Sequence, residues 1–174
     1  MLRRLFNSSD NTLTLDPLVA VDRMLRATRA NERGDEVLRA LKALLPGDVR
    51  GYVVRGDDSN GYRFDAQTGY SAQLLELTPG HGPWRSPGPR LVANNIAEMF
   101  TPNEQALRAQ YADLGLRDAN STMVVPVAGR FASYGTLVLH RHGPPAFGED
   151  ELKQVARWGS VLGETQAKES ELGR

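Results

Sequence analysis

The stretch that decides the fold is residues 115–152, GLRDANSTMVVPVAGRFASYGTLVLHRHGPPAFGEDEL. Residues 123–127 are apolar and mostly β-branched, which predicts a buried or half-buried strand. Pro126 removes one backbone donor from this strand, so we expect it at a sheet edge, at a bulge or at a ligand-facing rim. Residues 134–140 predict a second strand, joined to the first by a loose hairpin loop at 129–133.

A helix start is predicted directly after these strands. Gly143 and the two prolines that follow it end the second strand. Gly148 is then placed as a helix cap, and Glu151 is spaced to reach back to the backbone donor of that cap, which is half of a capping box. Phe147 is spaced to pack on Leu152, and the acidic residues 149–151 suit the positive end of a helix dipole.

The order of these pieces resembles the C-terminal half of a GAF domain. In that family a small residue precedes a strand with a proline, a strand beginning near a glycine follows, and a Phe then leads into an acidic helix start with a Leu behind it. The positions that carry the resemblance are Ser121, Pro126, Gly135, Phe147, Glu151 and Leu152. The resemblance implies an α/β (α+β) fold: a GAF/PAS-like antiparallel sheet with the N- and C-terminal helices on one face and a pocket-forming loop and helix region on the other.

The 174 residues suit one domain of ordinary size. We expect a flexible N-terminal segment at 1–15, a single GAF-like domain at 16–169 and a C-terminal tail at 170–174. Asp16 and Pro17 predict the start of a first helix that runs to about residue 30. Gly34 is expected to break it, and Asp35 to cap a second helix that ends at residues 46–47.

Three further strands and one helix are predicted between these regions. Strands are expected at 50–55, at 62–66 with Tyr62, Phe64 and Ala66 on one face, and at 74–77. Thr101 and Glu104 form a capping box for a helix that ends at Gly115. The Gly- and Pro-rich residues 80–89 predict irregular structure.

Composition excludes several classes of function. Lys plus Arg equals Asp plus Glu at 21 each, which does not suggest a nucleic-acid binder. The absence of cysteine removes disulfides, thiolate catalysis and thiolate metal sites, and it is compatible with a reducing cytoplasm. No signal-like or membrane-spanning apolar run is present, so we expect no membrane segment. Residues 1–6 suit a frayed start better than a basic amphipathic anchor.

Catalytic and metal-binding chemistry find little support. None of the three histidines stands in a nucleophile–base motif, so we expect no catalytic residues, no cofactor and no metal. His140 and His142 share one strand face and could bind a metal with a third ligand, but a solvated strand end is favoured. Asp57, Asp58 and Asn60 lack the spacing of a calcium loop.

The family resemblance sharpens these exclusions. GAF domains that reduce free methionine sulfoxide use cysteines, and many GAF photoreceptors hold a bilin through a cysteine, whereas this chain has none. Cyclic-nucleotide GAF domains carry a spaced Asn, Lys, Phe, Asp, Glu signature. Phe147, Asp150 and Glu151 resemble the end of this signature but lie one residue too close together, and its Asn–Lys part is not recognisable. Cyclic-nucleotide binding is therefore not supported.

A ligand-binding set is expected on the face where the family places its pocket. Trp84 in the irregular loop is a lid or a cap on the core, Asn94 and Asn95 make turn or ligand contacts, and Tyr111 lies in the core or the pocket. Pockets combine apolar walls with a few polar groups. The candidate ligand-binding residues are Trp84, Asn94, Asn95, Phe100, Tyr111 and Thr122.

A homodimer through the terminal helices is also expected. The last helix has one apolar stripe to cover the sheet and a second stripe that packs on the first helix or on another chain. GAF modules often pair through these helices, which favours the dimer. The candidate interface residues are Leu18, Met24, Leu25, Trp158, Val161 and Thr165.

The function expected from the resemblance is that of a sensory or regulatory module. It would bind an unknown small molecule and signal through a protein partner or a dimer, without catalysis. The alternative is a structural interaction domain whose pocket is filled by its own side chains, and an enzyme is the least supported class.

Overall fold

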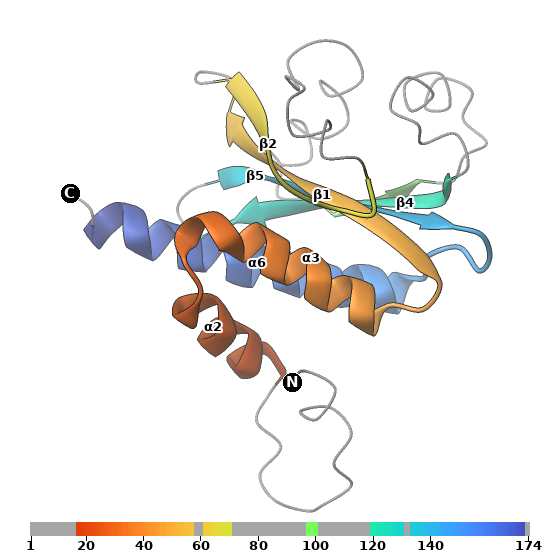
Figure 1. Cartoon of the computed structure of the whole chain (residues 1–174), viewed down its shortest axis with the longest axis horizontal. Helices are drawn as coiled ribbons and strands as arrows, with labels where there is room; N and C mark the ends of the chain where they lie inside the picture. Colours follow the sequence, from red (N-terminus) through yellow and green to blue (C-terminus); the bar gives the residue numbers. More distant parts are fainter. Residues whose placement is uncertain (1–16, 58–60, 71–96, 101–118, 131–132, 173–174) are drawn as a thin grey trace, which may run out of the picture.

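The computed structural model describes residues 17–57, 61–70, 97–100, 119–130 and 133–172 (Figure 1). Within these residues, five strands form one antiparallel sheet in the order β2-β1-β5-β4-β3. The strands are β1 (Asp48–Asp57), β2 (Gly61–Thr68), β3 (Glu98–Phe100), β4 (Ala119–Ala128) and β5 (Ser133–His142).

The described helices all lie on one side of this sheet. They are α2 (Pro17–Ala27), the short 3₁₀ helix η1 (Ala30–Glu32), α3 (Arg33–Leu44) and α6 (Glu149–Leu172). Helices α3 and α6 cross one face of the sheet, and α2 packs against α6 further from the strands (Figure 1). The predicted fold class, with the terminal helices together on one face, is therefore confirmed.

The larger core lies between the sheet and these helices. Leu137 and Leu139 of β5 belong to it, and Val138 between them points to the opposite face, as alternation along a strand predicts. Val155 and Leu162 of α6 complete it from the helical side and are almost fully buried. The stripe of α6 predicted to cover the sheet does so.

The boundary between the first two helices differs from the prediction. Helix α2 ends at Ala27, and α3 begins at Arg33, so Gly34 and Asp35 lie inside its first turn. Gly34 is required for packing, because a Cβ at that position would lie 2.8 Å from the Ala66 Cβ of β2. The glycine marks a close contact between a helix and a strand rather than a helix break.

The predicted shared face of Tyr62, Phe64 and Ala66 is wrong. The β1–β2 register shifts by one residue, so that Val54 pairs with Phe64 whereas Val53 pairs with Ala66. Phe64 consequently packs on the face that carries none of the described helices, called the helix-free face below in that sense only, and Ala66 packs in the core beneath the described helices. A bulge of this kind leaves one extra residue in one strand and reverses the alternation after it.

Among the described residues, Pro126 has a neighbouring strand on one side only. Strand β4 lies between β5 and β3, but β3 pairs only with residues 122–124 of it. Among the described residues, no strand pairs with Pro126 on that side. Its carbonyl instead lies beneath α6, where a Cβ on Gly159 would come within 2.5 Å of the Pro126 oxygen.

Several predicted elements lie outside the described residues. These are the N-terminal segment 1–15, the strand at 74–77, the irregular loop at 80–89 and the helix that begins at Thr101. Helix α6 continues to Leu172, past the predicted domain end at residue 169 and into the predicted tail. None of the described helices is both long and apolar enough to cross a membrane.

Candidate functional site

The helix-free face of the sheet carries a second, smaller cluster of buried side chains. Its members come from four strands and are Tyr52, Val54, Phe64, Val124 and Val138, with Tyr70 packed against them. The ring of Tyr52 lies at its centre, 5.4 Å from Phe64 in an edge-to-face contact and 6.3 Å from Tyr70, measured between ring centroids. Such aromatic pairs stabilise a packed surface beyond the area that they bury.

A buried hydroxyl–imidazole pair adjoins this cluster. Thr122 of β4 and His140 of β5 are register partners, and a hydrogen bond of 2.8 Å joins Thr122 Oγ1 and His140 Nδ1. The His140 ring also contacts Tyr52 at 5.7 Å and Tyr70 at 6.2 Å. Thr122 is 4 % exposed and His140 is 0 % exposed, so the prediction of a solvated strand end is wrong for His140.

The environment keeps the His140 imidazole neutral. Burial, with a smaller contribution from the nearby His142, lowers its pKa from 6.5 to about 3. A hydroxyl beside an imidazole can act as an activated nucleophile, but an efficient general base needs a pKa near the working pH. A histidine with this pKa is a poor base, so the pair is suited to hydrogen bonding rather than to catalysis.

Among the described residues of this face, charged groups lie at the rim and not among the buried side chains. Arg50 is the register partner of His140 on β1, and its guanidinium pairs with Asp48 at 2.9 Å. The hydrogen bond from Arg50 lowers the pKa of the Asp48 carboxyl. The described buried residues that carry charge, Arg33 and Arg141, hydrogen-bond within the helical side. The buried part of the helix-free face therefore presents aromatic, aliphatic, hydroxyl and neutral imidazole groups.

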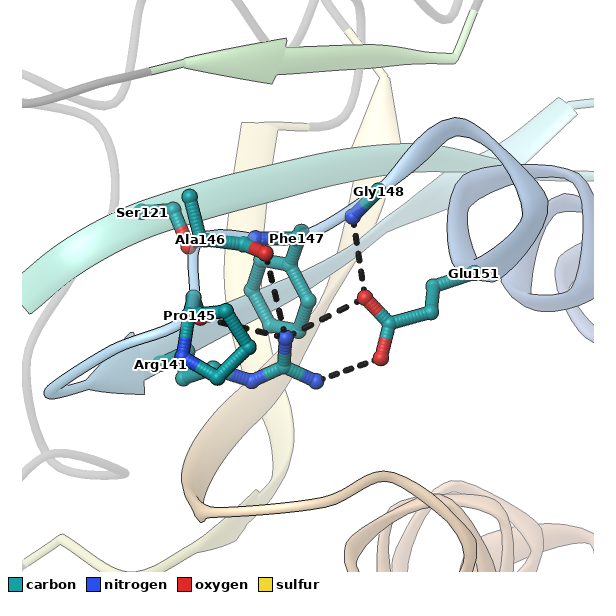
Figure 2. Close-up of polar contacts among 7 residues, drawn as sticks. All are labelled: Ser121, Arg141, Pro145, Ala146, Phe147, Gly148 and Glu151. Atoms are coloured by element: carbon teal, nitrogen blue, oxygen red, sulfur yellow. Dashed lines mark hydrogen bonds and ion pairs between the residues drawn. The ribbon is translucent and has the colours of Figure 1, made fainter.

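On the opposite side of the same strands, Arg141 anchors the start of α6 (Figure 2). Its fully buried guanidinium bonds both carboxylate oxygens of Glu151, at 2.6 and 3.1 Å, and donates to the carbonyls of Pro145 and Ala146. The guanidinium carbon lies 4.2 Å from the ring centroid of Phe147. The hydrogen bonds from Arg141 lower the pKa of Glu151, so the carboxylate stays ionised.

Two backbone donors complete this junction. The Gly148 N–H donates to Glu151 at 2.9 Å, which confirms the predicted half of a capping box. The Phe147 N–H donates to the Ser121 hydroxyl of β4 at 3.0 Å. Strands β4 and β5 therefore both hold the segment that leads into α6 (Figure 2).

The predicted ligand-binding residues are only partly described. Thr122 lies on the helix-free face as expected, and Phe100 of β3 is its register partner. Trp84, Asn94, Asn95 and Tyr111 lie outside the described residues. The sequence reasoning missed Tyr52, Phe64, Tyr70 and His140, although alternation along the predicted strands offered a signal for Tyr52 and His140.

The predicted interface residues are largely buried within a single chain. Leu25, Trp158 and Thr165 are 0 %, 3 % and 3 % exposed, whereas Met24 and Val161 are half-buried. Leu18 belongs to α2, but its side chain is not among those that the structure describes. The packing of α2 and α3 on α6 accounts for this burial without a second chain, so Trp158 cannot be the exposed anchor of an interface in this conformation.

Arg33 reinforces that packing. It donates to the Leu25 and Thr28 carbonyls at the end of α2, and to the Thr165 carbonyl of α6. Gln166 of α6 donates to the Ala30 carbonyl of η1. The end of α2 is thus tied to α6 by hydrogen bonds from buried side chains.

Comparisons with known proteins agree on one fold. No family model matches the chain, and no curated protein sequence matches it. The GAF domain of a phosphoenolpyruvate-protein phosphotransferase from Coxiella burnetii is 19% identical, with a TM-score of 0.71 over 90% of this chain and 94% of that one. The corresponding GAF domain from Acinetobacter is 16% identical, with a TM-score of 0.68 over 95% and 99% of the two chains.

A third similar structure comes from a different class of protein. The GAF domain of a putative sensor histidine kinase from Pseudomonas syringae pv. tomato is 17% identical, with a TM-score of 0.61 over 90% of this chain and 86% of that one. These structures share the sheet and the helices described above. Their sequence identities to this chain are too low for a ligand of theirs to be inferred for it. The chain has the fold of a GAF domain.

Proposed function

We propose that this chain is a non-catalytic sensory or regulatory module that binds a small molecule on the helix-free face of its sheet. The observation that carries the proposal is the buried Thr122–His140 pair beside the aromatic cluster around Tyr52. Ligand sites combine apolar and aromatic walls with a few placed polar groups. The buried, uncharged character of this face favours a ligand that is itself neutral where it contacts the sheet.

The proposed output is a protein partner or a homodimer. GAF domains of sensor histidine kinases and of phosphotransferases share the fold, which supports a regulatory role. For a homodimer, α2 offers Val19, which is 40 % exposed, and separately the half-buried Met24, and α6 offers Val161. The low pKa of His140 makes this histidine a poor general base, and the cysteine-free sequence is compatible with a cytoplasmic location.

A structural interaction domain is the second candidate. The rings of Phe64, Tyr70 and His140 all contact Tyr52, so the helix-free face already packs on itself. A face filled in this way needs no ligand. Native mass spectrometry of freshly purified protein separates the two candidates, because a co-purified small molecule supports the sensor and its absence favours the filled scaffold.

A fluorescence screen tests whether the chain binds a small molecule. The chain has two tryptophans, so Trp158→Phe leaves Trp84 as the single reporter. We expect a compound from a broad metabolite and nucleotide screen to change Trp84 emission and raise the melting temperature. If no compound changes either, the scaffold candidate is favoured.

A matched pair of variants then places the ligand on one side of the sheet. Thr122 and Thr165 are both buried threonines, on the helix-free face and on the helical side respectively. We expect Thr122→Val to weaken binding and Thr165→Val to leave it unchanged. Equal effects of the two variants would contradict a site on the helix-free face.

A further inference from the structure

At one point of the sheet, two adjacent residues of β4 pair with two adjacent residues of β5, and this group of four is called the crossing below. Ser121 and Thr122 are adjacent on β4, His140 and Arg141 are adjacent on β5, and the register pairs Thr122 with His140 and Ser121 with Arg141. Because successive side chains of a strand point to opposite faces, each strand places one residue of its pair on each side. All four residues are at most 4 % exposed.

The two sides of this crossing make different contacts. On the helix-free face, Thr122 and His140 bond to each other. On the helical side, Ser121 accepts the Phe147 N–H, and Arg141 binds Glu151 in the first turn of α6. Figure 2 shows these helical-side contacts converging on one short segment that leads into α6.

We propose that this crossing is a mechanical link by which a change at the Thr122–His140 hydrogen bond alters the stability of the first turn of α6. The four side chains are buried, and protein interiors are close-packed, so a shift of either strand has to move neighbouring protein atoms rather than water. A displacement of Thr122 moves the adjacent Ser121, and a displacement of His140 moves the adjacent Arg141. The role of a ligand as the source of that displacement rests on the proposed function, whereas the link itself does not.

Thr136 provides a matched control on the same face. It lies on β5 with His140, is 6 % exposed, and its register partner on β4 is Pro126. Its neighbour Leu137 packs in the apolar core and, unlike Ser121 and Arg141, has no polar side-chain group that could bond the segment before α6. Loss of the Thr136 hydroxyl therefore perturbs the same face without reaching the crossing.

Hydrogen exchange of backbone amides in the full chain, without ligand, tests the link. We expect Thr122→Val to accelerate exchange at Phe147, Gly148 and Leu152 roughly three- to tenfold relative to Val53 in β1, the range that corresponds to one lost hydrogen bond. Thr136→Val is expected to cause no such selective change. Thr122→Ser, which keeps the hydroxyl, is expected to behave like the wild type.

The outcomes decide the proposal in either direction. Unchanged relative exchange at the α6 start in Thr122→Val, or an equal effect in Thr136→Val, overturns it. Should Thr122→Val fail to fold, the reverse experiment decides, because coupling is reciprocal: Glu151→Gln must shift the His140 ring nitrogen resonances while Asp150→Asn leaves them in place. Since no ligand is added, a failed small-molecule screen would contradict the proposed function and leave this result standing.

Discussion

Helix α6 approaches the backbone of β4 at Gly159 and Gly163. This close approach predicts that Gly163→Ala destabilises the chain. A Cβ at residue 163 would lie 2.2 Å from the carbonyl carbon of Ala128 and 2.5 Å from its oxygen, whereas ordinary contact begins at 3.4 Å. The atoms that it would meet belong to backbone, so no rotamer change relieves the overlap. Helix α6 has to retreat from β4 by about an ångström, which loosens the packing of its neighbours along the same stripe.

Two opposing contributions set the expected size of the effect. Alanine gains about 1 kcal/mol over glycine in a helix interior through its higher helix propensity. Overpacking a core typically costs about 1–3 kcal/mol, and a clash with backbone belongs at the upper end of that range. We expect a net loss of about 2 kcal/mol in the free energy of unfolding, or about 4–8 °C in Tm for a chain of this size.

Urea and thermal unfolding followed by far-UV circular dichroism measure this change. The control is Ser160→Ala in the same helix, because Ser160 is exposed and its hydroxyl donates to the Ala156 carbonyl within the helix itself. That variant should stay within about 0.5 kcal/mol of the wild type. A Gly163→Ala protein that is as stable as the wild type, or more stable, refutes the close packing of α6 on β4.

Three further predictions concern buried side chains. The lowered pKa of His140 means that the unfolded chain binds an additional proton below pH 6.5, so stability should fall by about 2 kcal/mol between pH 8 and pH 5; pH-dependent unfolding of His140→Gln should lack this part of the slope. Glu151→Gln leaves Arg141 buried without its ionic partner and should cost about 3 kcal/mol in chemical denaturation. Asp150→Asn, which removes only an exposed 4.0 Å pair with Lys153, should cost almost nothing. Trp158→Ala should destabilise the single chain by about 3–5 kcal/mol, and a loss of dimer with unchanged unfolding would instead restore its place at an interface.

The start of α6 shows what local sequence can predict. The roles of Gly148 and Glu151 follow from a spacing of three residues, and the observed hydrogen bond between them agrees. The partner that fixes the same carboxylate, Arg141, could not be identified in this way. It lies on a strand, and its approach to Glu151 depends on how the helix packs on the sheet.

The candidate site was predictable to a smaller extent. Alternation along 134–140 places Leu137 and His140 on opposite faces, as the structure has them, because the side-chain period of a strand is two. The burial of His140 was missed, since a histidine near the end of a strand is solvated unless other strands and rings surround it. The Phe64 and Ala66 assignment failed because a one-residue bulge has no signature in residues that are themselves good strand formers.

The amino-acid sequence by itself determined the local elements of this protein: two strands, the capped start of α6 and the apolar stripe that covers the sheet. It also determined the exclusion of every chemistry that needs a cysteine. Only the tertiary structure decided that Gly34, Gly159 and Gly163 are contact points and that Thr122 and His140 meet. Contacts of this kind join residues far apart in the chain, and their energies depend on strand register and on distances between backbones, which no local pattern encodes.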